Sequence, residues 1–523
     1  MKRNIKEILG YARGSNYAIL FIYLLLIFTG DLFIHGKSGM VISAIRIVFA
    51  LALSIAIFSG LEKKQNKIHI SILNQNILRV FFYVGPFLVM IIYFAVYYPG
   101  AISGDNMWQY TQAESGNYND WHPVLHTILA MKIPQLLTGG WVGAPTFFQI
   151  IVYSVIVGYA LNVCMDYVGI LFSVISYSLI VLNPQSGNIM MFPWKDVAFG
   201  MGALLLLSYG LRVYKTNGLW LMKGVNLALL VLAATVTSMM RHNAVLFTIP
   251  YIVAVCLLSN WKRSVIVCVS ILTLVFSIKY PLYNLLEVER PDRGIIEIMG
   301  VPMNIIGAAT TYTPELLDEE VLAFAYKVSP EQVWNEKYTI GNYNALKWDV
   351  LTDNDVLDDY GIGNVLDLTI RCFKESPKVS TKALLSTIAP VYSISSMGNG
   401  NISPVTNNEG TVFEQSINEK SHIRIESMNG FLDKHFYSFL MPLGMIHLLI
   451  IITILIQSDL KNKQDYKRIL LVSSPLIYNW GTALMLTGSW DAIRFFWYTF
   501  NCTPIVLACF NKDNSKYLSI GEV

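Results

Sequence analysis

Residues 79–98 read RVFFYVGPFLVMIIYFAVYY, and residues 97–123, which overlap and follow them, read YYPGAISGDNMWQYTQAESGNYNDWHP. The first stretch carries one charge, at its first position, and has the length of a membrane-crossing helix, about 20 residues. The second stretch gathers acids, aromatic residues and a histidine. Because charged groups are costly inside a membrane, a polar loop at the mouth of such a helix is a candidate functional site.

The composition is that of an integral membrane protein. Of the 523 residues, 54% are hydrophobic and 14% are charged, and the mean hydropathy is +0.48, far above that of a soluble domain. The apolar runs are continuous rather than alternating, which indicates helices and not barrel strands. The six cysteines are scattered, mostly within apolar runs, so we interpret them as buried hydrophobic side chains. We expect no cleavable signal peptide.

We therefore predict an all-α integral membrane protein with about twelve transmembrane helices. The expected spans are 17–34, 40–59, 79–98, 145–165, 167–183, 196–212, 224–240, 243–259, 264–283, 436–457, 469–487 and 495–511. The stretch 122–138 is apolar but short and carries Lys132, so we expect it at the membrane interface. As a thirteenth span it would invert the topology that follows. We find no internal repeat, so an inverted-repeat transporter gains no support.

Basic residues predict the orientation, because they concentrate on the cytoplasmic side of membrane proteins. With twelve spans, one face receives both tails and 19 basic residues, and the short loops of the other face carry 5. We therefore expect both termini in the cytoplasm and the 97–123 loop outside it.

This topology predicts three parts. Residues 1–283 hold nine spans and the candidate catalytic loop 97–123, and residues 436–523 hold three spans and a cytoplasmic tail. Between them, 284–435 forms an extracytoplasmic, mainly helical domain that carries 22 of the 35 acidic residues. We expect helices at 314–337 and at 365–388, the second broken near Pro377. The stretch 393–411, SISSMGNGNISPVTNNEGT, is expected to be a mobile loop or a lid on the substrate side.

Four polar clusters fall on the predicted outer face, and we expect them to form one pocket: 97–123, 183–196 (NPQSGNIMMFPWKD), 239–243 (MMRHN) and 488–498 (GSWDAIRFFWY). The catalytic candidates are Asp105, Asp120 and His122. The substrate-binding candidates are Gln109, Trp121, Trp194, Lys195, Asp196, Arg241, His242, Asn243, Trp490, Asp491 and Arg494. Taken singly, the cations also fit interfacial anchors, the acids fit partners of neighbouring cations, and the tryptophans fit the aromatic belt of any membrane protein.

The location restricts the chemistry. A reaction outside the cytoplasm has no access to nucleotide sugars, so an activated sugar must arrive on a lipid carrier such as a polyprenyl phosphate. Transfer from such a carrier needs a carboxylate base for the acceptor hydroxyl and cations for the leaving phosphate. Asp105 supplies the first, and Lys195, Arg241 and Arg494 supply the second.

At these residues the chain resembles the GT-C superfamily of polytopic membrane glycosyltransferases. The motifs are YPGAISGDNMWQ (98–109), NDWHP (119–123), PWKD (193–196) and, more weakly, RHN (241–243). The resemblance implies a polyprenyl-phosphate sugar as donor and an acid of the outer loop as catalytic base, which is Asp105, with Asp120 as competitor. In many such enzymes this loop follows the first span, whereas here it follows the third. Some use a divalent metal, to which Asp105, Asp120 and His122 would contribute.

The resulting prediction is a bacterial plasma-membrane glycosyltransferase. It would move a sugar from a carrier of the undecaprenyl phosphate type to an envelope (cell wall) glycopolymer or lipid-linked glycan, with inversion at the anomeric carbon. We assign it no definite cofactor, and we expect no nucleic-acid partner. Two alternatives stay open. One is a polysaccharide polymerase or ligase that uses a pyrophosphate-linked glycan. The other is a flippase or transporter of an envelope precursor.

Overall fold

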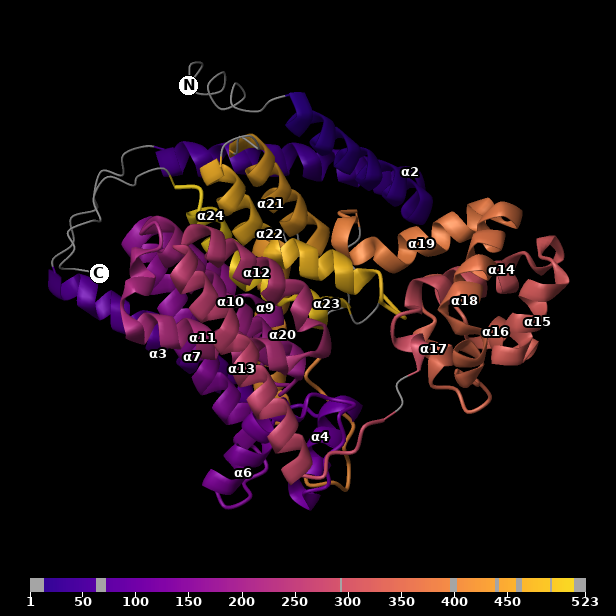
Figure 1. The fold of residues 1–523 in the computed structure, drawn as a ribbon, viewed down its shortest axis with the longest axis horizontal. Helices are drawn as coiled ribbons and strands as arrows, with labels where there is room; N and C mark the ends of the chain where they lie inside the picture. The colour runs from indigo at the N-terminus through magenta and orange to yellow at the C-terminus, as the bar shows by residue number, and fades with distance from the viewer. Residues whose placement is uncertain are drawn as a thin grey trace.

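A computed structural model describes residues 14–62, 72–291, 294–395, 402–437, 442–457, 463–489 and 492–511. These residues are mainly helical and contain isolated β-bridges but no strand, so the all-α prediction is confirmed for the described part. Both tails lie outside the described residues, and so do Trp490 and Asp491. Figure 1 shows a large helical body with a smaller group of helices at one side.

The body holds the helices that are long and apolar enough to cross a membrane. Among the described residues five stretches meet that condition: Asn16–Ile57, Leu73–Val96, Ala144–Tyr167, Lys195–Lys215 and Trp261–Leu285. They belong to α2 (Gly14–Glu62), α3 (Ile72–Val96), α7 (Ala144–Tyr167), α10 (Lys195–Lys215) and α13 (Trp261–Leu285). The body also contains α8 (Ile170–Val181), α11 (Gly224–Met240), α12 (Val245–Leu258), α21 (Leu443–Gln457), α22 (Lys463–Ala483), α23 (Ala492–Phe496) and α24 (Tyr498–Ala508).

Helices lie at or within the positions of the expected spans, but only five stretches of the described residues are long and apolar enough to cross a membrane, so the twelve predicted spans are not confirmed. The first two expected spans both fall within α2, which consists of two helical parts that meet at a kink at Gly36, where φ is 68°. Glycine adopts this left-handed conformation without the steric cost that a Cβ atom imposes, and Figure 1 shows α2 running out and back. The expected interface helix 122–138 forms α5 (Val124–His126), a π-helical turn at Thr127–Lys132 and α6 (Ile133–Leu137).

Helix α10 lies at the centre of the body and packs against α7, α11, α12 and α24. Small residues allow this close approach, as in other membrane-helix packings. A Cβ atom at Gly200 would lie 2.6 Å from the Cβ of Tyr498 on α24, and one at Gly202 would lie 2.3 Å from Thr237 Oγ1 on α11. The tight packing fixes the N-terminal end of α10, where Lys195 and Asp196 lie.

The segment expected as a soluble domain, 284–435, divides into two parts. The first forms α14 (Gly300–Tyr312), α15 (Glu319–Val328), α16 (Glu331–Lys337), α17 (Asn344–Lys347), α18 (Asp355–Glu375) and α19 (Pro377–Tyr392). We call residues 300–392 the side module (Figure 1). The helix break at Pro377 is confirmed, because α18 ends at Glu375 and Pro377 begins α19.

The second part, 402–437, returns to the body. Its irregular stretch precedes α20 (Glu419–Leu432), which packs against α3. Gln415 donates to the carbonyl of Gly100 at 2.9 Å, and the Phe413 ring lies edge-on to Tyr110 at 4.5 Å. Tyr93 of α3 donates to Asn429 at 2.6 Å. Asn408, in the described part of the Gly/Ser/Asn-rich stretch, donates to the carbonyl of Ile102 at 3.2 Å. This stretch and the residues that follow it therefore contact the 97–123 loop.

A buried carboxylate joins the side module to the body. Asp31 of α2 accepts hydrogen bonds from the hydroxyls of Ser43 and Ser393, and from the backbone N–H groups of Ile394 at 3.3 Å and Ser395 at 3.1 Å. Arg46 donates to the carbonyl of Ile394. Because buried polar groups are costly unless they are paired, these bonds fix the end of α19 against α2.

We expect Asp31→Asn to destabilise the protein by about 3 kcal/mol, because an amide nitrogen cannot accept the bonds that the carboxylate accepts. A lower midpoint of thermal unfolding of the detergent-solubilised protein measures this loss. Asp359→Asn is the matched control, since the Asp359 side chain is 73% exposed and its ion pair with Lys327 is 3.9 Å long. Equal midpoints for the two variants would contradict the role given to Asp31.

Candidate functional site

The 97–123 loop folds into a short helix that carries Asp105 in its first turn. This helix, α4 (Gly104–Ser115), begins after Ser103, whose backbone N–H donates to Asn106 Oδ1 at 2.5 Å. The Trp194 indole N–H donates to Ser103 Oγ at 2.9 Å. Because Trp194 directly precedes α10, this bond holds the start of α4 against the start of α10.

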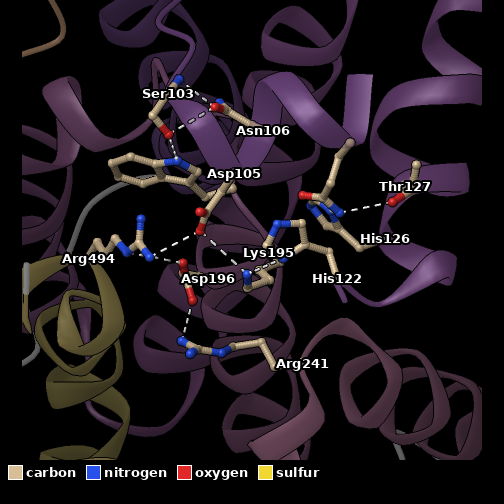
Figure 2. Close-up of polar contacts among 12 residues, drawn as sticks. Ser103, Asp105, Asn106, His122, His126, Thr127, Lys195, Asp196, Arg241 and Arg494 are labelled. Carbon is tan, nitrogen blue, oxygen red and sulfur yellow. Dashed lines mark hydrogen bonds and ion pairs between the residues drawn. The ribbon is translucent and has the colours of Figure 1, made fainter. Parts of the chain in front are cut away.

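Asp105 lies between two cations from distant parts of the chain. Its Oδ2 is 3.1 Å from Arg494 Nη2 and 3.5 Å from Lys195 Nζ. Figure 2 draws both contacts as dashed lines. The Asp105 side chain is 35% exposed, whereas those of Lys195 and Arg494 are 16% and 18% exposed. A carboxylate that solvent can reach is thus held by two cations that are mostly covered.

A second carboxylate, Asp196, lies close to both Arg241 and Arg494. Its side chain is fully buried, forms an ion pair with Arg241, and lies 3.8 Å from Arg494 Nε. The Phe495 ring lies 4.8 Å from the Arg241 guanidinium and 4.7 Å from that of Arg494. Asp196 has no exposed surface with which to contact a substrate. We therefore interpret it as the residue that positions both arginines.

His122 completes the cluster through Lys195. The Lys195 ammonium donates to His122 Nδ1 at 2.6 Å, so the imidazole accepts at this nitrogen and is neutral. Burial and the neighbouring charge of Lys195 lower the pKa of His122 to about 3, although Asp105 acts in the opposite direction. A neutral imidazole at this position orients the ammonium without adding a charge.

The electrostatics also keep Asp105 ionised. Burial alone would raise the pKa of the Asp105 carboxyl, but the charges of Arg494 and Lys195 outweigh it and bring the pKa below its ordinary value. A carboxylate must be ionised to act as a base, yet a lowered pKa makes it a weak one. Asp105 would therefore become a stronger base if the two cations moved away from it.

The structure brings together seven of the sequence-predicted residues. They are Asp105, His122, Trp194, Lys195, Asp196, Arg241 and Arg494, and we call them the charged cluster. Trp194 belongs to it because the Arg494 guanidinium lies 5.3 Å from its ring. These residues come from the start of α4, the NDWHP turn, the start of α10, the end of α11 and α23.

Other predicted residues have separate partners. Asp120 accepts from the Tyr283 hydroxyl at 2.8 Å and lies 3.8 Å from His242 Nε2. Gln109 is buried and contacts His126 and Thr127, each at 3.0 Å. Asn243 donates to Thr482 Oγ1 at 3.0 Å. These contacts give the NDWHP turn and its surroundings a defined shape. Of the predicted acids that the structure describes, Asp105 alone is accessible beside the cations.

Sequence reasoning missed two tryptophans: Trp108, which lies beside the cluster, and Trp348, which contacts Trp121. Trp108 follows Asp105 by three positions on α4, a spacing that places two side chains on one face of a helix, so the signal was present. The Trp108 ring lies 5.7 Å from the His122 ring. Trp348 of the side module lies 6.5 Å from Trp121, and no local pattern connects residues so far apart in sequence.

The suggested metal ligands do not form one group. Within the described residues, no three His, Cys, Asp or Glu side chains lie close enough together to hold a metal ion. Asp120 faces Tyr283, whereas Asp105 and His122 are both engaged by Lys195. The geometry gives no support to a site shared by these three residues.

Comparisons with protein-family models, with curated proteins and with solved structures found no match for this chain. The resemblance of its short motifs to membrane glycosyltransferases therefore stays an expectation.

We expect the His122 imidazole to stay neutral from pH 8 to pH 5, because its pKa is lowered to about 3. Histidine NMR, with the His122 signal assigned by its loss in His122→Gln, measures this. Lys195→Gln should move the pKa of His122 upward, since it removes the cation beside the ring. Titration of His122 near its ordinary value of 6.5 in the unaltered protein would contradict the Lys195 contact.

We expect Asp196→Asn to lower the free energy of unfolding by about 3–5 kcal/mol, because it removes the carboxylate paired with the largely buried Arg241 and one of the two carboxylates beside Arg494. The midpoint of thermal unfolding measures the loss. The double variant Asp196→Asn/Arg241→Gln should recover part of it, since one unpaired charge is removed with its partner. A double variant less stable than Asp196→Asn would show that the pair is not the source of the effect.

Proposed function

We propose that this protein is a membrane glycosyltransferase of the bacterial plasma membrane that uses a polyprenyl-phosphate sugar as donor. The observation that carries the proposal is the accessible Asp105 carboxylate, which lies between Lys195 and Arg494 at the N-terminal end of the apolar helix α10. The two cations suit a phosphate, and the carboxylate suits the acceptor hydroxyl. The apolar helices around them suit a lipid carrier.

The net charge of the cluster favours a single phosphate. Three cations, Lys195, Arg241 and Arg494, face two carboxylates, Asp105 and Asp196, and His122 is neutral, so one positive charge remains. A polyprenyl-phosphate sugar is a phosphodiester with one negative charge, which balances it. A pyrophosphate-linked donor carries two, so the cluster fits it less well.

Binding of the donor would activate the base. The phosphate draws Arg494 and Lys195 toward itself, and the pKa of Asp105 rises as these cations leave it. The acceptor oxygen then bonds to the anomeric carbon of the donor sugar, while the bond from that carbon to the phosphate oxygen breaks. The hydroxyl proton passes to Asp105, the bond electrons leave with the polyprenyl phosphate, and the anomeric configuration inverts.

The proposed topology places this chemistry outside the cytoplasm. If the chain has twelve spans and the face rich in basic residues lies in the cytoplasm, the end of α3 and the start of α10 lie at the outer surface of the membrane, next to the cluster. A carrier lipid that has crossed the membrane would present its phosphate at this depth. The acceptor would then be an envelope glycopolymer or a lipid-linked glycan.

We expect Asp105→Asn to abolish sugar transfer, because the amide cannot accept the hydroxyl proton. The assay follows release of polyprenyl phosphate from a panel of undecaprenyl-phosphate sugars by the purified protein in lipid nanodiscs. Asp359→Asn, an exposed acid of the side module, is the matched control and should keep full activity.

Two further results decide between mechanisms. Lys195→Gln and Arg494→Gln should each weaken donor binding about tenfold or more, since each removes a charge-assisted contact to the phosphate. Near-normal transfer by Asp105→Asn would remove the base assignment. Turnover of pyrophosphate-linked glycans and not of phosphate-linked sugars would instead favour a polymerase or ligase.

A further inference from the structure

Three tryptophan rings form a row beside the charged cluster. Trp108 of α4 lies 6.4 Å from Trp121 of the NDWHP turn, measured between ring centroids. Trp121 lies 6.5 Å from Trp348, which directly follows α17 of the side module. Three separate segments therefore contribute one indole each, and we call the row the indole row.

The indole row is not core packing. Trp108 is 43% exposed and Trp348 is 65% exposed, whereas the tryptophans of the core, such as Trp334 and Trp497, are fully buried. Exposed indole carries a hydrophobic cost that burial against a ligand would remove. The arrangement is thus better suited to receiving a ligand than to stabilising the fold.

The row ends at the candidate site. The His122 ring lies edge-on to Trp108 at 5.7 Å, and the same imidazole accepts from Lys195 of the charged cluster. Trp108 and Asp105 occupy one face of α4, three positions apart. A molecule lying along the row would therefore bring one end next to the Asp105 carboxylate.

Charged groups flank the outer end of the row. The Lys347 ammonium lies 5.0 Å from the Trp348 ring and is paired with Glu297, and Asp349 is paired with Lys337. Charged groups are costly in hydrocarbon, so these ion pairs favour a polar ligand over lipid tails. The exposed Val350 and Leu351, which come next in the chain, make the bilayer surface the competing occupant.

We propose that Trp108, Trp121 and Trp348 bind successive sugars of an extended glycan acceptor. A pyranose has an apolar C–H face that packs on an indole, and the ring-to-ring steps are comparable to the length of one sugar unit. The acceptor is then a glycan of three or more sugars, not a single sugar. This inference rests on the proposed function, because it takes Asp105 as the base that the acceptor hydroxyl must reach.

Stacking on an indole reads the face of a sugar ring more than the pattern of its hydroxyl groups, so simple glucans are adequate probes. The protein in lipid nanodiscs is titrated with β-1,4-, β-1,3- and α-1,4-linked glucose hexasaccharides and with the matching disaccharides, and tryptophan fluorescence reports binding. We expect saturable binding of at least one hexasaccharide, about tenfold tighter than that of its disaccharide.

Variants of the outermost ring test the row directly. Trp348→Ala should weaken hexasaccharide binding about tenfold, the effect typical of removing an aromatic anchor, and Trp348→Phe should retain most of it. Trp261→Ala is the matched control, since Trp261 is 72% exposed at the start of α13 and belongs to no part of the row. Absence of length-dependent binding, or equal binding by Trp348→Ala, would overturn the proposal.

Two parallel measurements separate the outcomes. The first measurement uses brominated lipids in the nanodisc, which quench nearby tryptophans. Trp348 emission, obtained as the difference between the unaltered protein and Trp348→Phe, should be quenched less than Trp261 emission. Equal quenching would assign the row to the bilayer and overturn the proposal. Binding of undecaprenyl phosphate is followed in the same samples. If the protein binds undecaprenyl phosphate but no glycan, the proposed role of the indole row is wrong and the proposed function stands. If it does not bind undecaprenyl phosphate, the proposed function is wrong.

Discussion

The buried carboxylate of Asp196 is the constraint on which the candidate site depends. It holds Arg241 and Arg494, which come from helices far apart in sequence, and so allows both guanidinium groups to lie near Lys195. Three cations gathered without it would repel one another, and burial would make the repulsion stronger. Because Asp196 is the second residue of α10, the packing of that central helix fixes where the cations meet.

Consecutive residues at the start of α10 therefore have different tasks. Asp196 is buried and faces the arginines, whereas Lys195 faces Asp105 and His122. The Trp194 bond to Ser103 sets the distance between this helix start and α4. A change in that bond would move Asp105 relative to Lys195 without altering either residue, so the short loops before α4 and α10 determine the geometry as much as the charged residues do.

Much of the helical pattern could be predicted because apolar continuity is a local property of the sequence. The expected span 224–240 coincides with α11, but α8 has 12 residues where 17 were expected, since Gly169 and Pro184 bound it. The charged residues of the cluster were also predictable, as Asp105 lies in the polar loop that follows an apolar run and the others stand next to one. The Asp31 contacts and Trp348 were not, because their partners lie hundreds of residues away or on a separate module.

The side module connects the indole row to the arginine side of the cluster. Asn344, four residues before Trp348, forms two hydrogen bonds with Thr487, which lies in the segment before α23. The Asn344 N–H donates to the Thr487 carbonyl at 3.0 Å, and the Asn344 side chain accepts from the Thr487 hydroxyl at 3.1 Å. Ser489 donates to Gly341 at 3.1 Å. A glycan on Trp348 would thus hold the segment that carries Arg494. In the proposed mechanism a phosphate that bound Arg494 and Lys195 would release Asp105. The proposed base would then gain strength after the donor is in place, and an acceptor bound alone would meet a weak base.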